Sequence, residues 1–162
     1  MPTANTLTKV IKDERIADYG RLVATQRRLH RLFDRSLRTA VGISIVWYEA
    51  MLRLAHAPER RMPITDLGEA LELTSSGATR LVDRLEESGF IERVPCPTDR
   101  RVLWARLTDQ GLKVLNEATR VHLNDLDLHF VSRLNPEDMV TLKDLLRRLH
   151  GDTGLAPVRA VH

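Results

Sequence analysis

Short hydroxyl side chains and arginines gather at helical spacing between residues 75 and 88. Four apolar residues of this stretch predict the buried stripe of an amphipathic helix: Ala78, Leu81, Val82 and Leu85. The same phase turns a polar set outward: Ser76, Thr79, Arg80, Asp83, Arg84 and Glu87. Arginine can donate two hydrogen bonds to the edge of guanine, and serine and threonine can bind bases or phosphates, so this face has the chemistry for reading DNA in the major groove. The candidate contacts are Ser75, Ser76, Thr79, Arg80 and Arg84.

A solvated helix face explains the same pattern, because Asp83, Glu86 and Glu87 make this helix locally acidic. The helix alone therefore does not decide between DNA binding and simple exposure to water. The segment that follows it favours DNA binding.

After Gly89 the period changes to two and predicts a β-hairpin, with strands over Phe90–Val94 and Val102–Thr108. Four arginines flank or occupy its exposed, proline-containing turn: Arg93, Arg100, Arg101 and Arg106. An arginine at a hairpin tip can enter the narrow, electronegative minor groove while the preceding helix lies in the adjacent major groove. Arg100 and Arg101 are therefore candidate DNA contacts, and Asp99 is expected to stabilise the turn by accepting hydrogen bonds. A merely soluble turn is the alternative.

Helices on both sides must position these two features. An amphipathic helix is predicted over Ile16–Leu37, with more apolar surface than one neighbour can cover, and a nearly all-apolar, central helix follows Gly42 over 43–55. A short strand at 62–64 and a helix at 66–71, N-capped by Thr65, lead to the polar helix, which Thr74 or Ser75 caps and Gly89 ends.

Beyond the hairpin, Thr108 is expected to cap a long helix from Asp109 to about Arg133. Asn135 and Pro136 form a strong start signal for a last helix that stops at Gly151.

The predicted fold is mainly α-helical with a small β-hairpin wing, in the order helix, helix, strand, helix, helix, hairpin, helix, helix. Such an order is that of a winged helix-turn-helix with a helical dimerisation region from both termini. We expect one domain over residues 1–150, with the winged core over about 43–108 and dimerisation helices over about 15–40, 109–134 and 136–150. Residues 151–162 are expected to be a mobile tail.

Composition restricts the class of protein. The 162 residues carry a net charge of only +3, so any contacts with DNA must be local. The single cysteine, Cys96, cannot form an intramolecular disulfide, and we expect neither export nor a membrane span, which fits a cytoplasmic protein. We find no phosphate loop, nucleophile elbow or convincing metal spacing, so no enzymatic activity, cofactor or metal is predicted.

Several of these stretches together resemble the MarR family (multiple antibiotic resistance regulators). The matching stretches are residues 64–71, residues 79–93, Asp99-Arg100-Arg101 and residues 107–111. The resemblance implies an obligate homodimer that binds double-stranded, palindromic DNA and represses transcription. It also implies release by a small effector, often a phenolic or lipophilic acid, bound between the dimerisation and DNA-binding parts. In the same way it marks Arg101 as the wing-tip arginine and Asp99 as its acidic partner.

Three features keep alternatives open. Trp47 and Tyr48 fit a hydrophobic core, and an aromatic wall of an effector pocket is the second interpretation. Cys96 fits an incidental thiol or a redox sensor, and His122, Asp125 and His129 fit a solvated or interface face or a zinc site. For the whole chain, the alternative function is a dimeric helical ligand-binding or protein-interaction module without DNA binding.

Overall fold

The computed structural model describes residues 12–96 and 102–150. In chain order these residues form α2 (Glu14–Val41), α3 (Ile45–His56), a 3₁₀ turn (Pro58–Arg60), β1 (Arg61–Pro63), α4 (Ile64–Ala70), α5 (Ser75–Glu87), β2 (Ile91–Pro95), β3 (Leu103–Leu107), α6 (Asp109–His129), a second 3₁₀ turn (Val131–Arg133) and α7 (Pro136–His150). This mainly helical fold with a small sheet is the predicted one. The expected tail, 151–162, lies outside the described residues.

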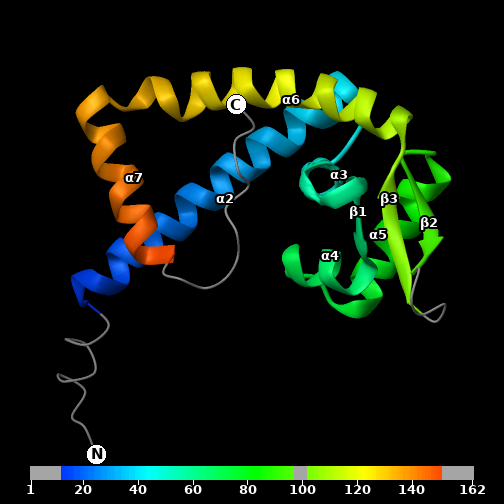
Figure 1. Ribbon diagram of the computed structural model, residues 1–162. Coiled ribbons are helices and arrows are strands. Elements are labelled where there is room, and N and C mark those ends of the chain that lie inside the picture. The colour runs from blue at the N-terminus through cyan, green and yellow to red at the C-terminus, as the bar shows by residue number, and fades with distance from the viewer. Residues whose placement is uncertain (1–11, 97–101, 151–162) are drawn as a thin grey trace, which may run out of the picture.

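Figure 1 shows two parts, a frame of three long helices and a smaller lobe below one end of it. In the frame, α2 and α6 pack together, and α7 descends from the far end of α6. In the lobe, α3, α4, α5 and the sheet lie below the N-terminal end of α6. The helix α6 therefore joins the frame directly to the hairpin.

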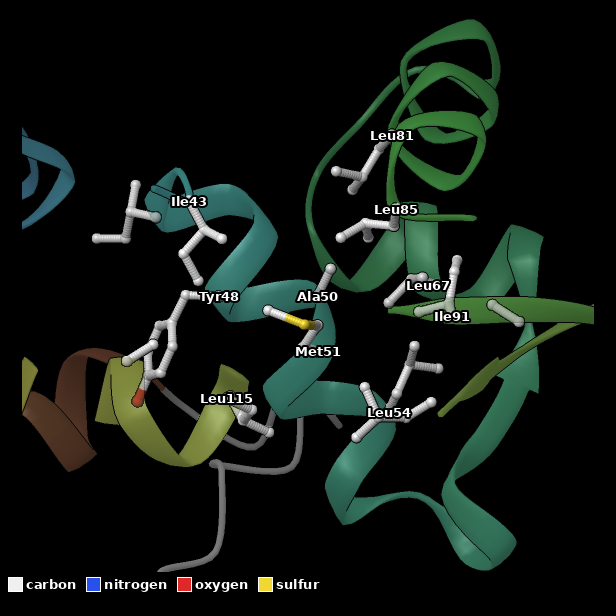
Figure 2. Close-up of a cluster of buried hydrophobic side chains, with 14 of the residues drawn as sticks. Ile43, Tyr48, Ala50, Met51, Leu54, Leu67, Leu81, Leu85, Ile91 and Leu115 are labelled. Carbon is white, nitrogen blue, oxygen red and sulfur yellow. The ribbon is translucent and has the colours of Figure 1, made fainter. Parts of the chain in front are cut away.

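The core of the lobe is built around α3. Leu54, Met51 and Ala50 of this helix are fully buried, and side chains from α4, α5, β2 and α6 close around them (Figure 2). Ser44 caps the helix by accepting a hydrogen bond from the Trp47 N–H. The predicted central position of this helix is confirmed.

Three short antiparallel strands form the sheet, in the order β1-β3-β2. Ile91 of β2 and Ala105 and Leu107 of β3 point to the core, as the period of two predicts. Arg61 of β1 lies opposite Arg106 of β3. The hairpin is confirmed, and the short strand lies one residue earlier than the predicted 62–64.

The helix-turn-helix packs closely at one glycine. A Cβ at Gly68 of α4 would lie 2.8 Å from the Cβ of Ala78 on α5, so only glycine allows this separation of the two helices. The predicted N-cap of α4, Thr65, is wrong. The helix begins at Ile64, directly after Pro63, and the Thr65 hydroxyl donates to the Asp66 carboxylate instead. Pro63 ends β1 in extended conformation. The helix starts at the next residue, Ile64, before the predicted start at Asp66, and has no side-chain cap.

The helix α6 begins at Asp109, with the predicted Thr108 as its N-cap. The prediction that it continues to about Arg133 is wrong, because Phe130 leaves helical conformation (φ −125°, ψ −64°) and a 3₁₀ turn follows. The start of α7 is as predicted: Asn135 accepts a hydrogen bond from the Asp138 N–H at 2.8 Å.

Asp34 joins α2 to α3. Its carboxylate accepts a hydrogen bond from the N–H of Ile45, the first residue of α3, at 3.0 Å, and one from Arg38 at 2.7 Å. Partial burial alone would raise the pKa of Asp34, but these two hydrogen bonds outweigh it and hold the pKa below its ordinary value of 3.8.

We expect Asp34→Asn to lower the melting temperature at pH 7 and to remove part of its pH dependence. The folded pKa lies below the unfolded one, so the ionised carboxylate stabilises the fold above about pH 4, and this contribution is lost as the pH falls through the lowered pKa. The difference in melting temperature between wild type and variant, followed by circular dichroism from pH 7 to pH 3, should therefore become smaller toward the acid end. Glu117→Gln, an exposed position on α6, is the control. A constant difference at every pH would contradict the assignment.

Candidate nucleic-acid interface

The helix α5 presents a polar face from a firmly buried base. Thr74 caps it by accepting a hydrogen bond from the Gly77 N–H at 3.2 Å. Its buried residues are the four predicted ones: Ala78, Leu81, Val82 and Leu85. The candidate contacts are all exposed: Ser75, Ser76, Thr79, Arg80 and Arg84. This arrangement leaves one helix face free for a partner.

Arg80 and Arg84 are the two basic side chains of this face. Within the described ranges, neither Arg80 nor Arg84 forms an ion pair. The Thr79 hydroxyl donates to the Ser75 carbonyl at 3.0 Å and keeps lone pairs for a further hydrogen bond. Both guanidinium groups can therefore donate to an external acceptor.

Arg93, expected to flank or occupy the exposed turn, lies in β2 beside it, and its side chain is turned toward α5. Arg93 shares the inner face of β2 with Ile91, and its side chain contacts Asp83 at 2.5 Å and also Glu86, both on α5. Burial would lower the pKa of this guanidinium, but its hydrogen bonds to the two carboxylates outweigh that effect and raise the pKa. Asp83, expected to face outward, is thus tied to the sheet. The period of two, which places residues 91 and 93 on one face, was the signal that would have shown this.

On the outer face of the sheet, the described arginines are also engaged. Arg106 pairs with Glu92 of the neighbouring strand at 2.7 Å. Arg61 lies over the Trp104 ring, 5.3 Å from its centroid, and pairs with Glu59. Asp99, Arg100 and Arg101 lie outside the described residues, so their roles stay predictions.

The aromatic pair of α3 lies in packed surroundings. Tyr48 is 5% exposed and contacts the His122 ring with 5.0 Å between centroids, while Trp47 packs edge-on against Phe90 at 6.1 Å. An effector role for Trp47 and Tyr48 stays a prediction.

A cavity of about 730 Å³ lies beside the start of α3, and neither Trp47 nor Tyr48 lines it. Its lining contains four basic side chains of α2, His30, Arg31, Arg35 and Arg38, with Asp34 among them. Ser44, Ile45 and Val46 of the α3 start complete the wall together with Thr39. Sequence reasoning missed this site, because only the packing of α3 on α2 creates it.

His122 is enclosed by aromatic rings rather than by metal ligands. Its ring contacts Phe33 edge-on, with 5.0 Å between centroids, in addition to the Tyr48 ring. Burial lowers the pKa of this imidazole, and the nearby Asp125 carboxylate offsets only part of that effect. Across residues 12–96 and 102–150, no group of three or more His, Cys, Asp or Glu side chains could hold a metal ion.

Within the described ranges, no helix is long and apolar enough to cross a membrane.

A helix-turn-helix with an exposed polar second helix, followed directly by an antiparallel hairpin, defines a winged helix-turn-helix protein. The model of the MarR family matches residues 41–102. The regulator PecS of Dickeya dadantii is 32% identical over 124 residues, which cover 76% of this chain and 71% of PecS. This chain therefore belongs to the MarR family of transcriptional regulators, and it is not an enzyme.

Further relatives and solved structures support this family assignment. The regulator MhqR of Bacillus subtilis is 32% identical over 87 residues, and this match spans 54% of the present chain and 59% of the length of MhqR. The crystal structure of Sco3205, a MarR family regulator from Streptomyces coelicolor in complex with DNA, superposes with a TM-score of 0.76 at 29% identity, covering 97% of this chain and 91% of Sco3205. AbsC from the same organism gives a TM-score of 0.77 at 26% identity, covering 86% of this chain and 93% of AbsC.

Proposed function

We propose that this regulator is a repressor that binds a palindromic double-stranded DNA operator as a homodimer, in the cytoplasm. The observation that carries the proposal is the exposed polar face of α5 beside a hairpin wing, with two arginines that form no ion pair within residues 12–96 and 102–150. In this proposal α5 enters the major groove and the wing the minor groove. The proposed DNA contacts are Ser75, Ser76, Thr79, Arg80, Arg84, Arg100 and Arg101, with Asp99 stabilising the wing.

The frame helices support the homodimer. No residue of α7 is buried in the single chain, and Leu149 is 73% exposed. Further large apolar side chains of α2, α6 and α7 are exposed: Ile16, Tyr19, Leu22, Leu123, Leu128, Val140, Leu145 and Leu146. A monomer rarely exposes so much apolar helix surface. We therefore propose that a second copy of the chain buries it in a homodimer interface of more than about 2,000 Å² in total.

The test is duplex binding by the full chain. We expect a dimer by light scattering at micromolar concentration, and tight binding to an inverted repeat with half-site centres about 10 base pairs apart. The affinity should fall steeply with salt, because several phosphates per lobe are neutralised. Duplexes from the DNA upstream of the gene, with scrambled versions as controls, provide the ligand. A monomer would contradict the proposed homodimer, and no binding to any of these duplexes at low salt would favour the dimeric interaction-module alternative.

We further propose that the effector is an aromatic or lipophilic acid held in the α2–α3 cavity. Arg31 and Arg35 line this cavity and form no ion pair within the described ranges, whereas Asp34 is already bound by Arg38 and the Ile45 N–H. The cavity therefore offers free positive charge beside the apolar Ile45 and Val46.

Benzoate and its hydroxylated derivatives are suitable probes. We expect them to raise the melting temperature and to release the operator from the wild-type dimer, and the effect should vanish in Arg31→Ala/Arg35→Ala. The amide benzamide, which has the same shape without the charge, is the matched control. An equal response to benzoate in the double variant would place the effector elsewhere.

A further inference from the structure

Arg93 connects the first wing strand to the recognition helix by three contacts. Its guanidinium binds Asp83 at 2.5 Å and also contacts Glu86. The Glu86 carboxylate in addition accepts a hydrogen bond from the Arg93 backbone N–H at 3.0 Å. Both carboxylates belong to α5, the helix whose exposed face carries Arg80 and Arg84.

Without Arg93, the charges on α5 would oppose DNA binding. The helix carries two arginines, Arg80 and Arg84, against three carboxylates, Asp83, Glu86 and Glu87. Asp83 also stands three residues after Arg80, the spacing at which an acidic and a basic side chain pair on a helix. An unengaged Asp83 would therefore compete with DNA for Arg80 and repel nearby phosphates.

In the structure, Arg93 rather than Arg80 engages Asp83. Asp83 is bound to Arg93, and Arg80 forms no ion pair within the described ranges. The side chain of Arg93 is 23% exposed and lies on the core-facing side of β2, so it cannot itself serve as a surface contact to a groove.

We propose that Arg93 is a positioning residue for DNA binding, which engages Asp83 and Glu86 so that Arg80 stays available to the operator. The inference rests on the proposed function. It assigns a role in recognition to a side chain that does not touch DNA.

The first experiment compares Arg93→Gln with Arg106→Gln in operator binding by the full-length dimer. Arg106 is a matched control, since it lies in the same hairpin and also pairs with a carboxylate, but on the outer face of the sheet. We expect Arg93→Gln to weaken operator binding about tenfold and Arg106→Gln to change it about twofold or less. Arg93→Lys, which keeps the charge, should stay close to wild type.

A triple variant distinguishes an electrostatic role of Arg93 from a purely structural role. In Arg93→Gln/Asp83→Asn/Glu86→Gln no carboxylate remains to compete for Arg80, so binding should return to within about threefold of wild type. A purely structural role of Arg93 predicts no such recovery, because the triple variant still lacks both ion pairs between β2 and α5. The loss in Arg93→Gln should also shrink as salt rises, because salt screens the exposed carboxylates.

Folding does not limit the test. Asp83 and Glu86 are 47% and 38% exposed, so water can solvate both carboxylates when Arg93 is removed, and circular dichroism should show a folded dimer. Should Arg93→Gln unfold, Asp83→Asn alone decides: we expect equal or tighter operator binding, and weaker binding would overturn the proposal.

Wild-type affinity from Arg93→Gln, or a triple variant as weak as Arg93→Gln, would also overturn it. Absence of operator binding by the wild type would instead contradict the proposed function itself.

Discussion

Replacing Gly111 by alanine is expected to lower the free energy of unfolding by about 2 to 4 kcal/mol, although it adds only one methyl group. A Cβ at this position would lie 2.1 Å from the Phe90 carbonyl oxygen and 2.8 Å from a methyl group of Leu107. The first turn of α6 thus packs directly against the backbone that joins α5 to the hairpin.

Neither side of this contact can move freely. The Phe90 carbonyl accepts the Thr108 N–H at 3.0 Å, and the Thr108 hydroxyl donates to the Gly89 carbonyl at 2.7 Å while capping α6. A shift of α6 would break these hydrogen bonds and move the hairpin relative to the frame. We therefore expect Gly111→Ala to weaken operator binding as well as stability.

Urea unfolding at a fixed protein concentration measures the effect, since the stability of a dimer depends on concentration. Glu117→Ala, an exposed position on the same helix, is the control and should change stability by about 0.5 kcal/mol or less. A Gly111→Ala protein as stable as this control would show that the contact relaxes at no cost.

Most of the fold could be predicted because its signals are local. The phase of α5 follows from four apolar positions, the hairpin from its period of two, and the starts of α6 and α7 from Thr108 and Asn135. The start of α4 and the end of α6 could not be predicted. Pro63 lets α4 begin at Ile64 without a side-chain cap, before the predicted start, and Phe130 leaves helical conformation although no proline or glycine stands there.

Part of the candidate site could likewise be predicted from the sequence, and part of it could not. The exposed side chains of α5 could be predicted from the phase of its apolar residues. The role of Arg93 could not, because its contacts depend both on the face of β2 to which it points and on Asp83 and Glu86 of α5. The link from Asp34 to the start of α3 and the basic cavity beside it arise from tertiary packing alone. Neither the Asp34 contact nor the cavity could be predicted from the periodicity of a helix or a strand.

Removing the Arg80 side chain should weaken binding to the best operator by about 1 to 3 kcal/mol and relax the preference at one base position of each half-site. Arg80 lies in the second turn of α5, is exposed, and has no ion-pair partner within the described ranges, so its guanidinium is free for bidentate contact with guanine. Its removal leaves no buried group unsatisfied, and Arg80→Ala should remain a folded dimer.

The comparison with Arg101→Ala separates base reading from contacts to the DNA backbone. If Arg101 enters the minor groove, where electrostatic attraction dominates, its loss should lower affinity on many A/T-flanked sequences and reduce the salt slope by about one. Fluorescence anisotropy on the operator and on single-base variants, at several salt concentrations, measures both effects. Arg80→Ala should change the ranking of the base variants, while Arg101→Ala should weaken all of them to a similar extent. Normal binding by Arg101→Ala together with unfolding of Arg80→Ala would refute both assignments, because loss of an exposed arginine on α5 can unfold the protein only if its side chain supports the core.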